Sequence, residues 1–343
     1  HAGYIKRTSL SEYKTQNRGG VGQKSAGTRD QDFLEHLFVA TNHQYLMFFT
    51  QKGKCYWMRV YEIPEGTKAS KGRAIQNLIN IEQDDKVKAF ICTQDLKDQD
   101  YINSHYVIMA TKQGQVKKTP LEQYSRPRQN GINAITIRED DELLEAKLTN
   151  GDSQVLVAVK SGKLVRFEEE KTRPMGRTAS GVRGITLADE KDEVIGMVSV
   201  NKDDINETQL LVVTENGYGK RTKLVDDDGE DVYRITNRGG KGVKTLNITE
   251  KTGALISINA VTDADDLMII NKSGLTIRME VSDLRVMGRA TQGVRLINIK
   301  GNDSIAAVTK VMKEDEPEEG VEGENENGEN TAETSDETNE IQE

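Results

Sequence analysis

The fold is decided by the stretch Arg173-Pro174-Met175-Gly176-Arg177-Thr178-Ala179-Ser180-Gly181-Val182-Arg183-Gly184-Ile185. This stretch aligns without gaps on residues 285–297, which lie 112 positions later, and 8 of the 13 residues are identical. Internal repeats with a period of about 20–50 residues are typical of propellers and solenoids. The chain is self-similar with a period of about 50 residues, and the offset of 112 corresponds to two periods, so the chain is predicted to consist of repeated structural units.

Each period begins with the pattern of a β-hairpin, in which an apolar run, a two-residue turn ending in glycine and a second run follow one another. In residues 155–167, β-branched runs flank the turn Ser161-Gly162. The turn glycines are Gly3, Gly53, Gly114, Gly162, Gly217 and Gly274. A second glycine follows 17 to 23 residues later and precedes another apolar alternation; these are Gly20, Gly72, Gly131, Gly181, Gly240 and Gly293. The pattern predicts six units.

Six units of about four short strands, with almost no helical periodicity, predict an all-β ring resembling a propeller, and a solenoid is the alternative. Positions 314–343 differ in composition, because they contain 14 Asp or Glu and no Lys or Arg. A segment so poor in large apolar residues cannot offset the entropy of ordering. We therefore predict a ring domain over residues 1–312 and a disordered acidic tail over residues 313–343.

The net charge of -9 conceals a basic body, because residues 1–313 contain 47 basic and 42 acidic residues. No apolar run is long enough to span a membrane, and the start of the chain lacks the apolar region of a signal peptide, so we expect a cytoplasmic location and no membrane partner. The first unit begins within its hairpin at Gly3, which suggests a fragment of a longer protein.

Catalytic and metal sites are not indicated. Cys55 and Cys92 are too far apart for a zinc knuckle, and His36 and His43 have no partner at metal-ligand spacing. The acidic loop 226–231 lacks the Glu that a calcium loop needs at its twelfth position, so a solvated loop is expected. The glycine-rich segments that begin at Gly19 and Gly239 fail the spacing of a nucleotide-binding loop, and no cofactor is expected.

Basic residues recur at matching places in the units. Three or four positions after the first glycine stand Lys6, Arg7, Lys117, Lys118, Arg166, Lys220, Arg221 and Arg278. Around the second glycine stand Arg18, Lys71, Arg73, Arg126, Arg128, Arg177, Arg183, Arg238, Lys241, Arg289 and Arg295. The second unit departs, with Trp57 at the first position and Lys54 and Arg59 nearby. In a ring, such positions predict a basic rim that binds the phosphates of a bent duplex, whereas a solvated strand face is the alternative for any single residue.

One loop of the first unit resembles a known sequence element. Residues 16–22, Gln-Asn-Arg-Gly-Gly-Val-Gly, resemble the gyrase A box, Gln-Arg-Arg-Gly-Gly-Lys-Gly, of the carboxy-terminal domains of DNA gyrase A-type subunits. The matching residues are Gln16, Arg18, Gly19, Gly20 and Gly22. Asn17 and Val21 replace basic residues, and Lys14 and Lys24 are the candidates to compensate. A second copy at residues 236–242 retains Lys241.

The resemblance covers residues 1–312 and implies a six-bladed β-pinwheel, in which neighbouring blades exchange strands. It implies that the domain bends duplex DNA around a basic perimeter, without catalysing a reaction itself. Its partners would be the other domains of gyrase A, together with gyrase B, in an A2B2 holoenzyme, an ATP-dependent type IIA topoisomerase that introduces negative supercoils at the nucleoid. The alternatives are a protein-interaction propeller that does not bind DNA and the corresponding domain of a topoisomerase IV A-type subunit.

Overall fold

The computed structural model describes residues 3–9, 23–24, 39–67, 70–299 and 303–312. Within these residues the backbone is mostly strand and loop, and the helical segments are short. They are α1 (Gln99–Ser104) and the 3-10 turns η2 (Val60–Glu62), η3 (Ile75–Asn77), η4 (Leu121–Tyr124), η5 (Glu169–Lys171), η6 (Lys202–Asp204) and η7 (Val281–Asp283). No helix in the described part is long and apolar enough to cross a membrane.

The strands form antiparallel sheets, which we number in chain order. Sheet 1 contains β1 (Tyr4–Ile5) and β5 (Arg73–Ala74). Sheet 2 has the order β6 (Val87–Thr93), β3 (Tyr45–Thr50), β4 (Lys54–Arg59), β9 (Ile132–Asn133). Sheet 3 has the order β10 (Leu143–Thr149), β7 (Tyr106–Thr111), β8 (Gln115–Pro120), β13 (Val182–Arg183).

The second half of the chain forms three more sheets of the same kind. Sheet 4 has the order β14 (Val194–Asn201), β11 (Ser153–Val159), β12 (Lys163–Glu168), β17 (Val243–Lys244). Sheet 5 has the order β18 (Leu255–Val261), β15 (Gln209–Thr214), β16 (Tyr218–Lys223), β21 (Val294–Arg295). Sheet 6 has the order β22 (Ile305–Met312), β19 (Asp265–Asn271), β20 (Leu275–Glu280), β2 (Gln23–Lys24).

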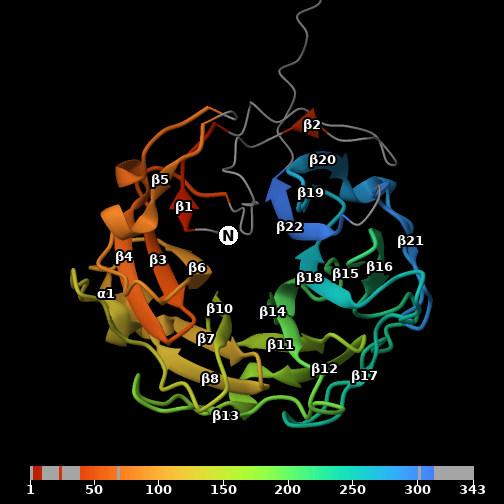
Figure 1. Ribbon diagram of the computed structural model, residues 1–343. Coiled ribbons are helices and arrows are strands. Elements are labelled where there is room, and N and C mark those ends of the chain that lie inside the picture. Colours follow the sequence, from red (N-terminus) through yellow and green to blue (C-terminus); the bar gives the residue numbers. More distant parts are fainter. Residues whose placement is uncertain (1–2, 10–22, 25–38, 68–69, 300–302, 313–343) are drawn as a thin grey trace, which may run out of the picture. The chain divides into compact units, whose positions relative to one another are not determined.

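Every four-stranded sheet takes its outer strand from another repeat. The short strands β9, β13, β17 and β21 each pair with a hairpin that precedes them by one repeat. The outer strand of sheet 6 is β2, near the start of the chain, which pairs with β20 through Gln23↔Thr276 and Lys24↔Leu275. This pair closes the arrangement into a ring, as in a propeller and unlike an open solenoid (Figure 1).

The described residues contain five four-stranded blades and one two-stranded sheet. The prediction of an all-β ring is therefore confirmed, but the prediction of six units of about four short strands each is met only in part, because the first repeat contributes just β1 and β2 to the described strands. The predicted tail, residues 313–343, lies outside the described residues, as does the box at residues 16–22.

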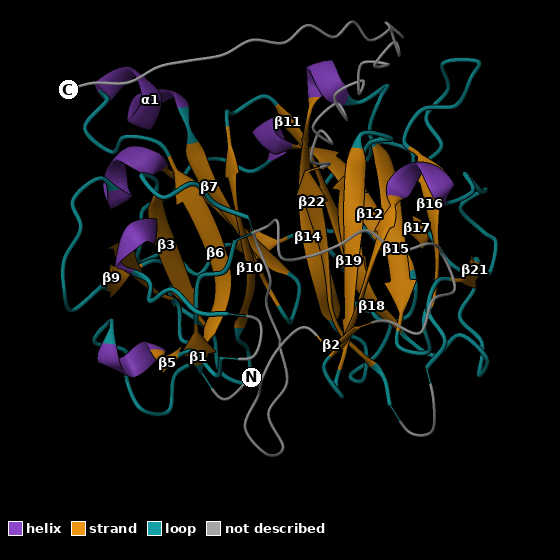
Figure 2. Ribbon diagram, turned by 90° about the horizontal axis from the view of Figure 1, so that it is seen from above, coloured by secondary structure: helices purple, strands orange, loops and turns teal. Residues whose placement is uncertain are grey.

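The core lies between neighbouring blades, and β11 shows why its sequence is an unbroken apolar run. Val155 and Val157 pack against sheet 3, whereas Leu156 and Ala158 pack against sheet 5. All four side chains are fully buried. Successive side chains of β11 therefore point alternately toward the two neighbouring sheets, and not alternately toward the core and the solvent. Burial of a Val or Leu side chain contributes about 1.5–3 kcal/mol, which makes the packing between blades the main source of stability. The long strands run roughly along the ring axis (Figure 2).

Exchange of the outer strand requires a glycine directly before it. Gly242, before β17, has a φ of +73°, and a Cβ there would lie 2.5 Å from the carbonyl oxygen of Leu164 in β12. Gly240, which the sequence pattern assigned to this role, has an ordinary φ, and its nearest neighbouring atom would be 3.8 Å away. The assignment of Gly240 as the second glycine of the fifth unit is therefore wrong by two residues, because the loop of that unit is longer.

Candidate nucleic-acid interface

The basic residues that follow the first glycine are mostly buried. Lys117, Lys118, Arg166, Lys220, Arg221 and Arg278 are at most 6% exposed. They lie on β8, β12, β16 and β20, and each of these strands is flanked by an inner strand and by the exchanged outer strand. The prediction that these six side chains belong to an exposed rim is wrong, because all six are buried within the ring.

The buried lysines hold the loop of the following repeat. Lys117 Nζ donates to the carbonyl oxygens of Ala134 and Arg177, at 2.6 Å in both cases. Lys220 Nζ donates to the carbonyl oxygens of Gly288 at 2.6 Å and Arg289 at 2.8 Å. In the first repeat, the half-buried Lys6 makes the same kind of contact, with the carbonyl oxygens of Thr67 and Ser70 at 2.8 and 2.9 Å.

The basic residues four positions after the first glycine form ion pairs, most of them across repeats. Lys118 pairs with Glu169 at 3.4 Å, Arg166 pairs with Asp231 at 2.9 Å, and Arg221 pairs with Asp263. Arg166 also donates to the carbonyl oxygens of Leu224 at 3.1 Å and Tyr233 at 2.9 Å. Within one sheet, Arg278 pairs with Asp266 at 2.7 Å. The half-buried Arg7 pairs with Glu65 at 3.2 Å. The pairs across repeats hold the blades together, and all of these pairs leave little charge for an outside partner.

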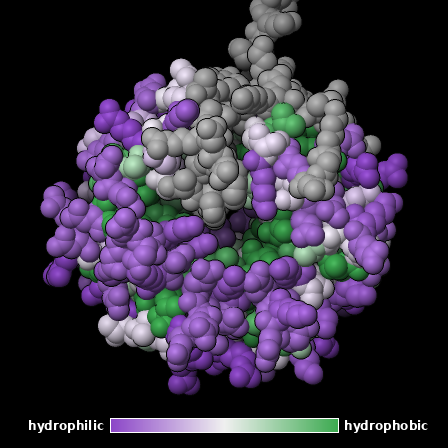
Figure 3. Space-filling model, in the orientation of Figure 1, coloured by the Kyte–Doolittle hydropathy of each residue, from purple (hydrophilic) through white to green (hydrophobic). Residues whose placement is uncertain are grey.

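The basic residues around the second glycine lie at the surface. Those that are exposed are Lys71, Arg73, Arg126, Arg128, Arg183, Lys241 and Arg295. Those that are half-buried are Arg177, Arg238 and Arg289. They belong to the outer strands and to the loops before them, and β13, β17 and β21 lie at the outer edge of the ring (Figure 1). On the face drawn in Figure 3, hydrophilic residues prevail along this edge.

The three half-buried arginines occupy equivalent positions between consecutive outer strands. In each case Nη1 donates to the carbonyl oxygen of the last residue of the preceding outer strand. The pairs are Arg177 with Asn133 at 3.2 Å, Arg238 with Arg183 at 3.2 Å, and Arg289 with Lys244 at 3.3 Å. This hydrogen bond fixes each planar guanidinium at the perimeter, and N–H groups that remain suit a phosphate oxygen.

The sequence pattern missed Lys244, an exposed residue of β17. Cross-strand register places it with Arg183 and Arg295, because Lys163↔Lys244, Gln115↔Arg183 and Tyr218↔Arg295 are matching pairs. The signal was present as glycine, valine and a basic residue in succession at residues 181–183, 242–244 and 293–295. The pattern at residues 242–244 was overlooked because Gly240, and not Gly242, was assigned as the second glycine of the fifth unit. Further exposed arginines near the outer strands are Arg173, Arg234 and Arg285.

Three arginines meet at one open depression of about 320 Å³. Arg126 and Arg128 come from the loop of the third repeat and Arg177 from the loop of the fourth; Glu122, Gln123 and Ile132 line the same depression. Gln123 Oε1 accepts a hydrogen bond from the backbone N–H of Arg177 at 3.2 Å, which ties the two loops together. Such a cluster of arginines is suited to an anionic oxygen ligand.

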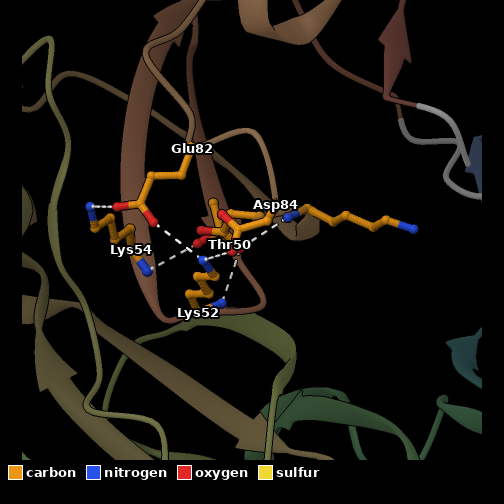
Figure 4. Close-up of polar contacts among 7 residues, drawn as sticks. Thr50, Lys52, Lys54, Glu82 and Asp84 are labelled. Carbon is orange, nitrogen blue, oxygen red and sulfur yellow. Dashed lines mark hydrogen bonds and ion pairs between the residues drawn. The ribbon is translucent and has the colours of Figure 1, made fainter.

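The cations near the first glycine of the second unit already have partners. Lys52 lies 2.6 Å from Asp84 and 3.3 Å from Glu82, and Lys54 bonds to the same Glu82 (Figure 4). The hydrogen bond to Asp84 raises the pKa of Lys52, and that to Glu82 raises the pKa of Lys54. Arg59, the other proposed substitute, stacks 3.5 Å over the ring of Tyr45. This unit therefore offers less free charge than the sequence suggested.

No group of three His, Cys, Asp or Glu among the described residues is arranged to hold a metal ion. In the acidic loop, Asp226 Oδ1 accepts the backbone N–H groups of Asp228 and Glu230 at 3.1 and 2.8 Å, and Asp227 pairs with Lys223. These carboxylates order their own loop. The box residues Gln16, Arg18, Gly19, Gly20 and Gly22, and also Lys14, lie outside the described residues.

Comparisons with known proteins agree with this architecture. The family described as "DNA gyrase C-terminal domain, beta-propeller" matches residues 1–41, 44–94, 105–150, 154–201, 208–262 and 265–312. The DNA gyrase A protein of Staphylococcus aureus strain NCTC 8325 / PS 47 is 43% identical over 318 residues, which are 93% of this chain and 34% of that protein. Its counterpart in strain MRSA252 is 44% identical over the same length. The chain spans about a third of the length of the curated relatives it matches.

Two solved structures are similar over most of the chain. A DNA gyrase A C-terminal domain has a TM-score of 0.77 and 26% identity, covering 91% of this chain and 97% of that one. The C-terminal domain of a DNA topoisomerase IV has a TM-score of 0.69 and 25% identity, covering 91% of each chain. The family match extends over six segments that together take in most of the sequence. The chain therefore belongs to the DNA gyrase C-terminal domain family, whose fold is a beta-propeller.

Proposed function

We propose that this domain binds duplex DNA and bends it around its outer perimeter. The observation that carries the proposal is the register of Arg183, Lys244 and Arg295, which are exposed and occupy equivalent places on three consecutive outer strands. Between them lie Arg238 and Arg289, each held by a hydrogen bond to a backbone carbonyl oxygen. A curved row of cations neutralises phosphates on one side of a duplex and so favours bending.

The interactions proposed here are with phosphates, so binding is largely independent of sequence. In the parent protein, the bent segment would be presented to the other domains of gyrase A and to gyrase B in an A2B2 holoenzyme, which would introduce negative supercoils with ATP. The domain itself would be non-catalytic and would work in the bacterial cytoplasm at the nucleoid. We further propose that the first repeat completes a sixth blade of a β-pinwheel, with its box as a wrapping element.

Bending is tested by energy transfer between dyes at the two ends of a duplex. The wild-type domain is expected to bring the ends together. The variant Arg183→Glu/Lys244→Glu/Arg295→Glu should bind every sequence more weakly, and its salt dependence should flatten by about 0.9 units of log–log slope for each phosphate that is no longer neutralised. Lys191→Glu, at an exposed position in the turn after β13, is the matched control and should behave as the wild type. An unchanged slope in the triple variant would place the DNA elsewhere.

A second candidate function is a domain that bends DNA without wrapping it, and the chain's similarity to the C-terminal domain of a DNA topoisomerase IV keeps a role other than that of a gyrase domain in view. A topological assay separates the two. A relaxed plasmid is incubated with the domain and a nicking-closing topoisomerase, and the linking number is measured after the protein is removed. A gyrase-type domain should leave positive superhelical turns in the plasmid, whereas a domain that only bends should leave the linking number unchanged.

A further inference from the structure

Lys117 and Lys220 are buried cations without a buried counter-charge. Both side chains are fully buried, and their ammonium groups bond to backbone carbonyl oxygens, together with the Thr291 hydroxyl at Lys220. Among the described residues, neither has a carboxylate within ion-pair distance, whereas the neighbouring Lys118 and Arg221 do. The carbonyl oxygens accept the hydrogen bonds of each ammonium group but do not neutralise its charge. Each protonated lysine is therefore a buried charge without a counter-ion.

The fold does not need a charge at this position. The matching residues three places after the first glycine are Tyr56, Val165 and Ile277 in the second, fourth and sixth repeats. These side chains are buried in blades of the same topology. Alternate repeats thus fill this position with an uncharged side chain, so packing alone does not account for the lysines of the third and fifth repeats. What these lysines add is a charge beneath the next loop.

The loops above the two lysines are alike. Lys117 bonds to the carbonyl oxygen of Arg177 in the loop 176–181, and Lys220 bonds to that of Arg289 in the loop 288–293. Each loop contains a single basic residue and no acidic one, and the guanidinium of that residue lies at the perimeter. By contrast, the loops of the third and fifth repeats carry two basic residues each, Arg126 and Arg128 or Arg238 and Lys241.

We propose that the loops 176–181 and 288–293 are phosphodiester-binding sites, each built from a surface arginine and a buried lysine supplied by the preceding repeat. The inference rests on the proposed binding of duplex DNA and adds which loops bind phosphate and which cations they use. In the six residues that end at the glycine before each outer strand, the third to sixth repeats then each present two cations, but in the fourth and sixth repeats one of the two is an internal lysine. A phosphate at Arg177 or Arg289 acts as the counter-ion that the lysine lacks inside the fold.

This arrangement couples phosphate binding to the protonation of Lys117 and Lys220. Burial lowers the pKa of Lys117 to about 7, and the Arg177 guanidinium contributes to that pKa shift; burial and then Arg289 lower the pKa of Lys220 to about 8. A phosphate at the loop opposes the effect of the arginine and raises these pKa values. The complex then keeps protons that the free domain has lost, so affinity is full below about pH 7 and falls as pH rises through the pKa values of the complex.

Two tyrosines and one cysteine near the lysines have pKa values that burial raises above this window. Near Lys117, Tyr124 donates to the same Ala134 carbonyl oxygen at 3.2 Å, and burial raises the pKa of Tyr124 and that of Cys55. Near Lys220, burial raises the pKa of Tyr233. Glu122 lines the same depression as Arg177 and makes no ion pair with Lys117 among the described residues. The two lysines are therefore the groups whose protonation a phosphate controls.

The test is calorimetric titration of the domain with a duplex at pH 8, repeated in buffers of different ionisation enthalpy to count protons. We expect the wild-type domain to take up protons on binding, up to about 1.4 per domain, because at pH 8 the free domain has lost about 0.9 proton from Lys117 and about 0.5 from Lys220. Affinity should fall about tenfold from pH 6.5 to pH 9 for each unit by which binding raises one pKa. Because the wild-type measurement needs no substitution, a folding defect cannot obscure it.

Lys117→Met/Lys220→Met should bind DNA more weakly at pH 6.5, show no proton uptake and have a flatter pH profile. Methionine fits a site that holds Val165 or Ile277 in other repeats, so the variant should fold. The matched control is Lys244→Met, at an exposed position, which should weaken binding and leave the proton uptake unchanged. Wild-type binding without proton uptake would overturn the inference alone, whereas failure to bind a duplex at all would overturn the proposed function.

Discussion

The ammonium of Lys118 lies 3.4 Å from the carboxylate of Glu169, and the two side chains are only 5% and 0% exposed. Lys118 belongs to the hairpin of the third repeat and Glu169 to the turn after the hairpin of the fourth. The carboxylate also accepts hydrogen bonds from the Thr149 hydroxyl at 2.7 Å and the Ser153 backbone N–H at 3.2 Å. A buried carboxylate with three donors links neighbouring blades at a single point.

Removal of one partner of this pair should be costly. Glu169→Ala leaves the Lys118 charge buried without its partner, so we expect the free energy of unfolding to fall by about 3–5 kcal/mol. Urea denaturation followed by circular dichroism measures it. Glu170→Ala is the matched control, because Glu170 is 68% exposed in its pair with Lys171 and should change stability by less than about 1 kcal/mol. Equal stability of the two variants would show that Glu169 is not a blade-linking residue.

The two glycines of the fifth-repeat loop should differ in their tolerance of a side chain. Gly242→Ala requires a positive φ and places a Cβ 2.5 Å from the Leu164 carbonyl oxygen, so we expect the free energy of unfolding to fall by about 1–3 kcal/mol. At Gly240 the nearest atom would be 3.8 Å away, and Gly240→Ala should change stability by less than about 0.5 kcal/mol. Thermal unfolding of both variants provides the comparison, and the reverse order would restore Gly240 as the strand-exchange glycine.

Removal of a perimeter cation should lower DNA affinity more when that cation has no carboxylate partner in the free domain. Arg128→Ala removes one of three arginines at the open depression and should lower affinity for a duplex severalfold. Lys54→Ala removes a cation that Glu82 already neutralises, so affinity should stay within about twofold. Fluorescence anisotropy at low salt measures both. A greater effect at Lys54 would mean that the ion pair opens when DNA binds.

Both cysteines should be slow to react with thiol reagents at pH 8. Burial raises the pKa of the Cys92 thiol to about 11, so the thiolate fraction at pH 8 is on the order of 0.1%. Burial also raises the pKa of Cys55, which is fully buried in β4. With an aromatic disulfide as the reagent, each reacting cysteine releases an aromatic thiol that absorbs light. The absorbance should rise slowly for the native domain and quickly in urea. A fast native phase would indicate that sheet 2 opens locally.

The sequence determined the repeat and the hairpins, because both depend on interactions between residues close in the chain. The run at residues 155–167 predicts β11 and β12 correctly, since β-branched residues and a Ser-Gly turn favour that geometry locally. The equivalence of Arg183 and Arg295, and their exposure at the outer strands, also followed from the aligned stretches 173–185 and 285–297. The pairing of β2 with β20 could be inferred only from the family resemblance.

Tertiary structure alone decided which cations face water. Lys117 and Arg183 are both basic residues at recurring positions, yet the first is fully buried and the second is exposed. The difference arises because the loop before the outer strand β13 comes from the next repeat and lies over the residues after the first glycine, as the hydrogen bond from Lys117 to the Arg177 carbonyl oxygen shows. Burial of this kind depends on interactions between residues about 60 positions apart, as between Lys117 and Arg177, and no local pattern records them.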